Sequence, residues 1–473
     1  MQLLRTQKRI SFDEGAQGLL LLLLISQLFL NNGIYLFIAA ICFAVIIHYL
    51  QQPLKPSVFT MIFIYHFIQI AAGIWLSNYQ GVDINFKSPN TGTATIISFA
   101  GLIVLMLPII HYQNKFPSLS LQTIREHANR LSISKTFYAY IIAFFLANLL
   151  GGIAFLFAGL TQVILIAIKV KWFLFLLFGF QVFIKNRMKK QFYLFIAIEF
   201  MLGFFSFFSD FKTVFFFLAF ILITFLRRVY LRHLVLAIIC LCITFFIGVL
   251  WSGVKGEYRK FLNQGQKEQV VVVSREEALE KLAELSAEQD AQTFNESVEI
   301  FLNRLQYTYH LAKAMEKVPA DIPYQYGKNW RETLDFVFTP RILNPDKPRY
   351  EASVKTRKYT GLAYAGARSG TSVSLGYFAD GYVDFGIIGM FVPILILGFV
   401  YGVTYFYFLR NSSSNYIFNF AVVGAIFMEF YAFEMDSTYL SGRLYVSLLV
   451  FFLLSIFFFP WLYRNLSSKA VLR

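Results

Sequence analysis

Long apolar segments separated by short polar ones form the dominant pattern along the chain. A helix needs about 20 mostly apolar residues to cross the hydrocarbon core of a bilayer. Segments of roughly this length predict membrane-spanning helices at residues 16–31, 34–50, 58–77, 94–113, 137–158, 161–184, 192–208, 213–226, 234–251, 381–409, 416–434 and 444–463. One long polar stretch, residues 252–379, interrupts this series. The pattern therefore predicts an all-α polytopic membrane protein with about twelve transmembrane helices and one large loop domain.

The polar stretch divides the chain into three parts. Residues 1–251 form a membrane domain with the first nine predicted spans, and residues 380–473 form a membrane domain with the last three. Between them, residues 252–379 form the loop domain. Apolar and charged residues are interspersed in this domain and leave no apolar segment long enough for a further span. We therefore expect the domain to lie outside the hydrocarbon core.

The loop domain itself has two predicted halves. Residues 274–317 show helical spacing of apolar side chains, and Ser274 with Glu277 forms a capping box at their start. Residues 320–376 are rich in Pro, Gly, Tyr and Arg and show little periodicity, which predicts an irregular, basic segment. A long irregular stretch in a compact domain usually carries function.

Composition supports the membrane assignment and charge gives it a direction. Of the 473 residues, 57% are hydrophobic and only 15% are charged, and the formal net charge is +15. Cytoplasmic loops are enriched in Lys and Arg, so the positive charge is assigned first to the two sides of a membrane and does not predict nucleic-acid binding. If the N-terminus is cytoplasmic, the opposite short loops carry only Lys87, Lys212 and Arg443. This asymmetry predicts two cytoplasmic termini and an extracytoplasmic loop domain.

A basic run from Phe338 to Gly361 is the most distinctive part of the loop domain. Its three prolines keep the backbone stiff and non-helical. Cations outnumber acids in it: Arg341, Lys347, Arg349, Lys355, Arg357 and Lys358 face only Asp346 and Glu351. Guanidinium and ammonium groups at a membrane suit an anionic headgroup such as a lipid-linked diphosphate. An ordinary basic surface loop attracted to acidic lipid is the alternative.

Charges also occur inside two predicted spans. Lys169 and Lys171 fall within 161–184, and Glu199 falls within 192–208. Charges at such depth are costly and are often functional. Two residues apart, the lysines point about 200° apart on a helix. Either one lysine pairs with Glu199 while the other reaches the interface, or residues 161–171 form an interfacial or re-entrant helix, which we favour.

Common catalytic motifs are absent from the sequence. The chain contains no Walker loop, no strand-associated GxGxxG unit, no HExxH, no CxxC pair and no GxSxG. The histidines show no spacing suited to a metal site, and the cysteines lie in apolar segments. We therefore expect no metal and no cofactor.

Two short motifs resemble a known family. The run Pro-Arg-Ile-Leu-Asn-Pro-Asp-Lys-Pro from Pro340 to Pro348 is followed by Asp-Gly-Tyr-Val-Asp-Phe-Gly from Asp380 to Gly386. Together they resemble the oligosaccharide repeat-unit polymerases of the Wzy type, the O-antigen polymerase-like membrane proteins. That family commonly has Glu and Asn where this chain has Asp380 and Asp384, and the shorter Asp380 carboxylate puts a role as base in doubt.

The resemblance implies a fold and an activity. It implies a body similar to the C-type glycosyltransferases, in the bacterial cytoplasmic (inner) membrane. Such an enzyme transfers an oligosaccharide from polyprenyl diphosphate to another lipid-linked repeat unit on the outer face, without a metal. The expected partners are the polyprenyl-diphosphate-linked oligosaccharide and the lipid bilayer, with a chain-length regulator and a flippase as further partners suggested by the resemblance.

Cations and acids of the chain agree with that chemistry. Cations stabilise the negative charge that develops on a departing diphosphate. The diphosphate-binding candidates are Arg304, Arg341, Lys347, Arg349, Arg357, Arg368, Lys169 and Lys171. The catalytic candidates are Arg341 for charge stabilisation and Asp380 and Glu429 as proton acceptors. Asp384, Glu434 and Asp436 also lie near the predicted outer face, and for all five acids helix capping or pairing with loop cations is the structural alternative.

Trp330 and Tyr350, near the basic run, are candidates for stacking on sugar rings, although interfacial aromatic residues also serve as membrane anchors. Other functions remain open on the sequence. A glycan ligase would use the same donor with a different acceptor. A polysaccharide or lipid transporter agrees with the number of spans but predicts internal repeats, which we do not find. A non-enzymatic scaffold for envelope assembly is a fourth alternative.

Overall fold

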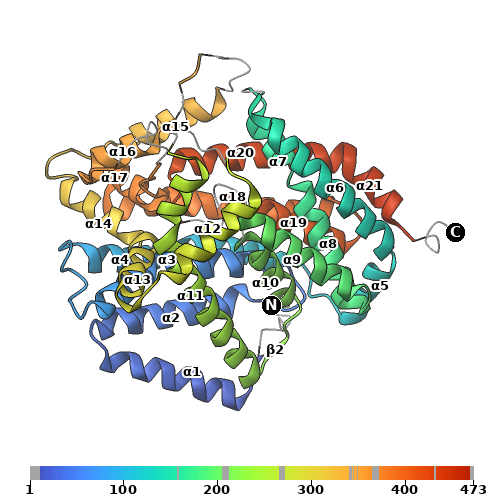
Figure 1. The fold of residues 1–473 in the computed structure, drawn as a ribbon, viewed down its shortest axis with the longest axis horizontal. Helices are drawn as coiled ribbons and strands as arrows, with labels where there is room; N and C mark the ends of the chain where they lie inside the picture. Colours follow the sequence, from blue (N-terminus) through green and yellow to red (C-terminus); the bar gives the residue numbers. More distant parts are fainter. Residues whose placement is uncertain are drawn as a thin grey trace, which may run out of the picture.

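The structure is a computed structural model that describes residues 11–156, 159–204, 212–265, 272–339, 344, 346–348, 350–364, 372–430 and 433–468. Helices make up most of it (Figure 1). In the part of the chain that the structure describes, the only paired strands are β1 (Ser11–Phe12) and β2 (Arg228–Val229), which are parallel. The predicted all-α class is confirmed.

Eight apolar helices or helix pairs among the described residues are long enough to cross a membrane. They are α2 (Gly33–Leu50), α3 (Val58–Tyr79), α4 (Thr91–Lys115), α6 (Ile133–Ile153), α7 with α8 (Thr161–Ala167 and Val170–Lys185), α11 (Leu231–Leu262), α18 (Phe391–Asn411) and α20 with α21 (Ser437–Leu453 and Phe459–Leu466). The remaining predicted spans coincide with shorter helices: α1 (Glu14–Ser26), α9 (Lys189–Phe204), α10 (Lys212–Thr224) and α19 (Tyr416–Phe427). The apolar helices are those expected of a membrane-embedded protein, and a total of twelve spans stays a prediction.

Close helix contacts hold the centre of this bundle together. A Cβ atom added at Gly398 of α18 would lie 2.5 Å from the carbonyl oxygen of Leu105 in α4, so only glycine permits this approach. Small residues at helix crossings are typical of membrane bundles. Elsewhere the many phenylalanines fill the core, as where Phe173 of α8 packs edge-on against Phe418 of α19 at 4.8 Å. Helix association therefore rests on glycine contacts and on aromatic packing.

The loop domain is more helical than the sequence predicts. Residues 274–317 contain α12 (Arg275–Ala287), α13 (Ala291–Leu305) and α14 (Thr308–Lys317), and the capping box of Ser274 and Glu277 is confirmed. However, α15 (Lys328–Phe338) and α16 (Ala352–Thr360) lie inside the segment predicted to be irregular. Both are short and polar, so they lack the long apolar stripe on which that prediction depended.

The predicted span at 381–409 is also corrected. It consists of α17 (Tyr377–Gly389) and α18, and α17 contains a kink at Gly386, where φ is +69°. Helices α14 to α17 gather at one end of the molecule, whereas α5 (Leu121–Asn129) and α21 lie at the opposite end (Figure 1). We call the first the loop-domain end.

Lysines at the opposite end cap the carboxyl ends of helices. The Lys55 ammonium donates to the carbonyl oxygens of Gln113 and Phe116 at 2.8 and 2.7 Å. Burial lowers the pKa of Lys55 to about 8. Lys135 likewise donates to the carbonyl oxygens of Asn465 and Ser467 at 2.9 and 3.0 Å. These cations satisfy carbonyl groups that a helix leaves unpaired at its end.

Candidate functional site

Two groups of charged residues lie at the loop-domain end, and both include residues of the segment between α19 and α20. The first, which we call the buried carboxylate cluster, consists of Tyr350, Lys355, Asp380, Asp384 and Asp436. The second, which we call the accessible charged cluster, has two parts, each with an acid on that segment: Glu429 with Lys169 and Arg443, and Glu434 with Arg304. The two clusters differ in burial and in the partners of their carboxylates.

Asp380 is fully buried on α17 and joins two other elements. Its Oδ1 atom lies 2.8 Å from the Lys355 ammonium of α16, in an ion pair. Its Oδ2 atom accepts a hydrogen bond of 2.8 Å from the backbone N–H of Ser437, in the first turn of α20. Asp380 therefore links α16, α17 and α20 through one carboxylate.

Asp436 is also fully buried and forms the N-cap of α20. Its Oδ1 atom accepts from the Tyr439 backbone N–H at 2.9 Å, and its Oδ2 atom accepts from the Tyr350 hydroxyl at 2.7 Å. Burial and the neighbouring Asp380 raise the pKa of Asp436 above its ordinary value. Burial alone would lower the pKa of Lys355, but the attraction of Asp380 and Asp436 outweighs it, so the pKa is raised.

Asp384 has a separate structural role one turn further along α17. Its carboxylate accepts from the backbone N–H groups of Asn329 at 3.4 Å and Trp330 at 3.0 Å, in the first turn of α15. A carboxylate at this position complements the positive end of a helix dipole. Burial raises the pKa of Asp384, against the effect of these two N–H groups. Asp384 thus caps α15 from outside that helix.

The rest of the motif from Asp380 to Gly386 is structural as well. The Tyr382 hydroxyl donates to the Val318 carbonyl oxygen at 2.6 Å. At Gly386 the left-handed backbone kinks α17, and a Cβ atom there would lie 3.2 Å from the Tyr324 ring. Both of its aspartates, its tyrosine and this glycine therefore fix how the loop domain meets the membrane helices.

The accessible charged cluster contains an ion pair between Lys169 and Glu429. Lys169 lies at the break between α7 and α8, and Glu429 follows α19. Their side chains keep 24% and 21% of their surface exposed, in contrast to the fully buried Asp380. Arg443 of α20 is exposed and close enough to interact electrostatically with Glu429. One acid and two cations thus meet at an accessible point.

A neighbouring pair supports the position of Lys169. The Lys171 ammonium lies 2.9 Å from Glu199 of α9, whose other carboxylate oxygen accepts from the Tyr140 hydroxyl of α6 at 2.9 Å. Lys171 also lies over the Trp172 ring, 4.2 Å from its centroid. The less favoured alternative, pairing of one lysine with Glu199, is confirmed for Lys171, and the favoured interfacial or re-entrant helix at 161–171 stays a prediction. Lys169 finds a partner, Glu429, that the sequence did not indicate.

Arg304 and Glu434 form the other half of the accessible charged cluster. Arg304 is exposed at the end of α13 and interacts electrostatically with Glu434. Gln69 of α3 donates its amide N–H to Glu434 and accepts the Phe433 backbone N–H at 2.8 Å. This glutamine fixes the segment that carries both acids of the cluster.

The other predicted cations, those of the basic run together with Arg368, lie elsewhere or outside the described residues. Arg341, Arg349 and Arg368 lie outside the described residues. Lys347 donates to the carbonyl oxygens of Phe336 and of Thr339, the latter at 2.8 Å, so it caps the end of α15. The remaining one, Arg357, donates to the Tyr364 carbonyl oxygen at 2.9 Å.

The two aromatic candidates are partly buried. Tyr350 packs against Phe336 at 5.6 Å and Tyr439 at 5.1 Å. Trp330 is half-buried in the first turn of α15. Of the residues not selected from the sequence, Lys355 and Arg443 occupy central positions. Arg443 carried one signal, because it is among the few basic residues in the short loops predicted to face outward.

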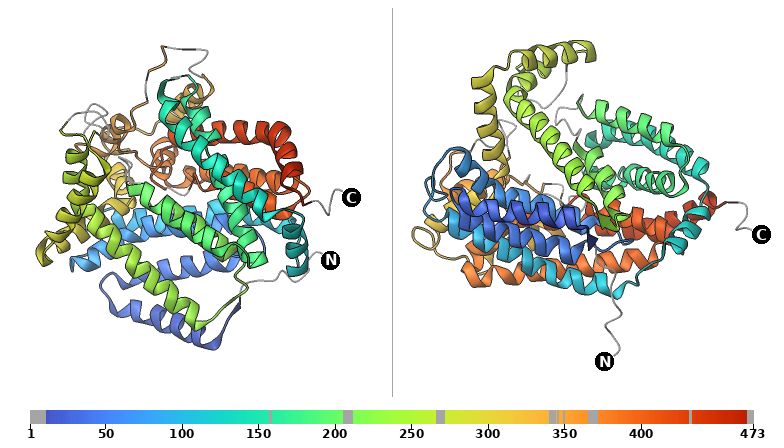
Figure 2. Two further views of the ribbon diagram at one scale, coloured as in Figure 1. Left: turned by 45° about the vertical axis from the view of Figure 1, so that its right-hand side comes forward. Right: turned by 90° about the horizontal axis from the view of Figure 1, so that it is seen from below.

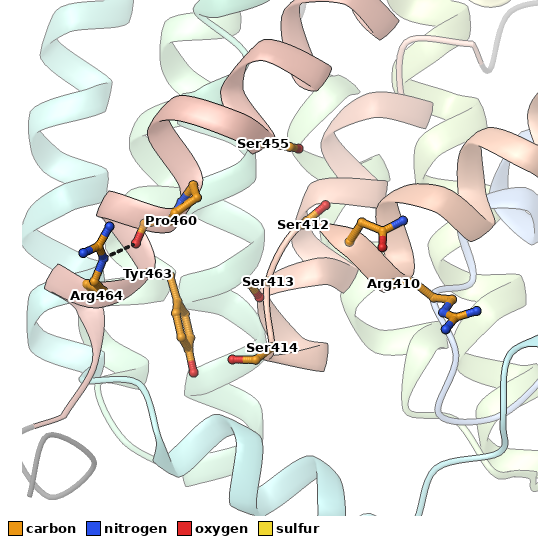
Figure 3. A pocket seen from close by; sticks show the side chains of 9 residues that line it. Arg410, Ser412, Ser413, Ser414, Ser455, Pro460, Tyr463 and Arg464 are labelled. Carbon is orange, nitrogen blue, oxygen red and sulfur yellow. Dashed lines mark hydrogen bonds between the residues drawn. The ribbon is translucent and has the colours of Figure 1, made fainter.

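Two further observations limit the choice of site. Among the described residues, no group of three or more His, Cys, Asp or Glu side chains could hold a metal ion. An open hollow at the end opposite the loop domain is lined by Ser412, Ser413, Ser414 and Tyr463, with Arg410 and Arg464 on opposite sides of the serine segment (Figure 3). Its two guanidinium groups do not converge, so it offers no preorganised anion site.

The comparisons with known proteins give a family for the chain. A family model described as a domain of unknown function, DUF8712, matches residues 64–428. Neither the curated proteins nor the solved structures gave a match. Lys169, Arg304, Lys355 and Asp380 lie inside the matched range, and Glu429, Asp436 and Arg443 follow its end.

Proposed function

Because the chain belongs to the DUF8712 family, whose domain has no known function, we propose a function from its charged residues: it joins polyprenyl-diphosphate-linked oligosaccharide repeat units into a longer polysaccharide. It would be a metal-independent glycosyltransferase with about twelve spans and a body similar to the C-type glycosyltransferases. Its place would be the bacterial inner membrane, with both termini cytoplasmic and the loop domain outside. The sequence resemblance and the lysine and arginine asymmetry support this placement.

The observation that carries the proposal is the accessible group of Lys169, Glu429 and Arg443. Ionised groups at the ends of membrane helices are costly unless they serve a purpose. In such a group, the two cations can bind an anionic headgroup and the carboxylate can take up a proton. A sugar diphosphate on a lipid carrier presents that headgroup at the end of an apolar chain, which suits a site at the ends of membrane helices.

The proposed reaction assigns one task to each of these groups. An acceptor hydroxyl attacks the anomeric carbon of the donor sugar, and its proton passes to Glu429. The bond between the anomeric carbon and the diphosphate oxygen breaks, and the leaving diphosphate takes the electron pair. Lys169 and Arg443 stabilise the charge that develops on it. In the absence of substrate, Lys169 pairs with Glu429, and the diphosphate would draw Lys169 away and free the carboxylate.

Under this proposal Asp380 positions the site and does not take the proton. Both of its carboxylate oxygens already have partners, in Lys355 and the Ser437 N–H group. Breaking a buried pair leaves an uncompensated charge, which is strongly unfavourable. Glu429 is the better proton acceptor because its partner is a partly exposed lysine. Arg341 of the basic run stays a predicted contributor to diphosphate binding.

The decisive experiment mixes the purified full-length chain, reconstituted in liposomes, with a polyprenyl-diphosphate-linked repeat unit. We expect a ladder of products that increase by one repeat unit per step. Transfer to a lipid or protein acceptor without a ladder would identify a ligase instead. Uptake of the substrate without lengthening would identify a transporter, and either result would overturn the proposal.

A further inference from the structure

The middle of α11 is exposed on every side. Each residue from Val235 to Phe246 is exposed, including Leu236, Leu241 and Ile243 at 59%, 61% and 54%. Consecutive helical residues point about 100° apart, so the continuous exposed stretch exposes every face of the helix along residues 235–244. At its outer end, Phe245 and Phe246 contact Phe301 and Phe294 of α13. Only 6% of the apolar part of α11 is buried, against 72% in α3. This bare segment is about 18 Å long.

The bare segment is held at its two ends. Beyond its outer end, Gly248 approaches Phe301 of α13 so closely that a Cβ atom would lie 2.7 Å from the ring. At its other end, β2 pairs with β1, and α11 contacts α1. Figure 2 shows α11, in yellow-green, as a long helix beside the rest of the bundle. In a bilayer, apolar chains must surround such a helix, including on the side that faces the bundle.

A cation marks the outer end of the bare segment. Arg304 follows Phe301 by one turn of α13 and is exposed. It belongs to the accessible charged cluster through Glu434. A molecule that lies along α11 with an anionic head at Arg304 would therefore combine a long apolar chain with negative charge. A polyprenyl diphosphate has both properties.

We propose that the bare segment of α11 holds the polyprenyl chain of one of the two lipid-linked substrates, with its diphosphate at Arg304. This inference rests on the proposed function, and it adds the path of the lipid chain. Packing between the chain and exposed side chains such as Leu236 and Ile243 selects a long apolar molecule. The guanidinium of Arg304 selects one with phosphate oxygens.

The test uses a polyprenyl diphosphate that carries a photoreactive diazirine in its chain, bound to the full-length protein in nanodiscs. Mass spectrometry then locates the labelled residues. We expect labels on residues 235–246 that excess unlabelled polyprenyl diphosphate suppresses and phosphatidylglycerol does not. Arg304→Gln should weaken this labelling about tenfold, since it removes a charged phosphate contact, and Arg304→Lys should retain part of it. Arg331→Gln, at an exposed arginine of α15, is the matched control and should change nothing.

The outcomes separate this inference from the proposed function. Equal labelling of α6, whose Phe145 and Leu149 are exposed at 66% and 64%, would show ordinary surrounding lipid and overturn the inference. Suppression by phosphatidylglycerol, or normal labelling in Arg304→Gln, would overturn it as well. If a product ladder forms while the labels lie elsewhere, only the path along α11 fails. If specific labels appear on α11 and no ladder forms, the polymerase proposal fails and a polyprenyl-binding surface remains.

Discussion

The two charged clusters at the loop-domain end both pair carboxylates with cations. They differ in burial and in whether the carboxylates are available to a ligand. In the buried carboxylate cluster, each oxygen of Asp380 and Asp436 already has a partner, and both residues are fully buried. In the accessible charged cluster, Glu429 pairs with a lysine that keeps a quarter of its surface exposed. Saturated charges stabilise a fold, whereas accessible ones can exchange a partner for a ligand.

This contrast changes the meaning of the motif from Asp380 to Gly386. Its carboxylates hold α16, α15 and the start of α20 in place, and its glycine permits the kink of α17. The acids with room for chemistry lie instead on the segment after α19. The partners and the burial of an acid near the outer membrane face are therefore better criteria for a catalytic role than its position in a motif.

Replacement of the proposed proton acceptor should have the largest effect. We expect Glu429→Gln to slow glycan transfer about 10²- to 10⁴-fold, because a general base contributes that much. The protein should still insert and fold, since Gln can accept from Lys169. The rate of ladder formation measures the effect. Asp335→Asn, at an exposed acid of α15, should transfer at the normal rate, and a normal rate in Glu429→Gln would remove Glu429 from the mechanism.

The buried carboxylate cluster should respond in stability. Asp380→Asn leaves the Lys355 ammonium without its ion pair, and breaking one partner of a buried pair costs about 3–5 kcal/mol. Thermal unfolding in detergent should therefore begin at a lower temperature. The double variant Lys355→Met with Asp380→Asn removes both charges and should recover most of the stability, because Asn still accepts from the Ser437 N–H group.

The double variant also distinguishes the two roles of Asp380. If Asp380 only positions the site, the recovered protein should transfer glycan at close to the normal rate. If Asp380 is the base, the double variant should unfold normally and remain inactive. That second result would assign the proton acceptor to the buried carboxylate cluster and remove that role from the accessible charged cluster.

Loss of a cation from the accessible charged cluster should have an intermediate effect. We expect Lys169→Ala to reduce transfer about 10- to 100-fold, since one of two groups that stabilise the diphosphate is lost. Lys169→Arg should restore part of the rate because it keeps the charge. Lys328→Ala, at a lysine of α15 that is 66% exposed, is the control. An equal loss in both alanine variants would indicate a general effect of surface charge.

The fold class could be predicted from the sequence because the length and polarity of each apolar segment indicate whether it can cross a membrane. The length and polarity of the segments at 58–77 and 94–113 suffice to predict α3 and α4. The helices α15 and α16 were not predicted, because they are short and polar and their contacts, of α15 with α17 and α20 and of α16 with α14, come from distant parts of the chain. Local periodicity carries no information about such contacts.

The sequence allowed us to predict several residues of the candidate site, but it did not allow us to predict which of them lie together. Lys169, Arg304 and Glu429 were candidates because charges near a membrane are costly. Their grouping depends on a helix break after Ala167 and on a pairing across 260 residues of chain. Asp380 was a catalytic candidate for the same reason, and the contacts with Lys355 and the Ser437 N–H group that favour a positioning role could not be predicted from the sequence. Sequence can locate an unusual charge, but its partners decide what the charge does.

The smallest predicted effect is the contribution of Asp436, in the buried carboxylate cluster, to the dependence of stability on pH. The pKa of Asp436 is raised in the folded protein by burial and by Asp380. The folded state therefore binds a proton more readily than the unfolded state between the ordinary carboxyl pKa, near 4, and the raised value. The free energy of unfolding should then increase as the pH falls through that window. The pKa of Lys355, raised above 10.5, leaves this window unaffected.

Thermal unfolding of the full-length protein at a series of mildly acidic pH values measures this dependence. Asp436→Asn should reduce the gain in stability on acidification, because Asn does not titrate in that range, and the raised pKa of Asp384 should preserve part of the gain. Glu429→Gln is the matched comparison from the accessible charged cluster and should act in the opposite direction, because Lys169 lowers the pKa of Glu429 in the folded protein and acidification therefore costs stability at that residue. If Asp436→Asn leaves the curve unchanged and Glu429→Gln reduces the gain in stability on acidification, the carboxylate with the raised pKa lies in the accessible charged cluster, and the contrast between the two clusters has to be reversed.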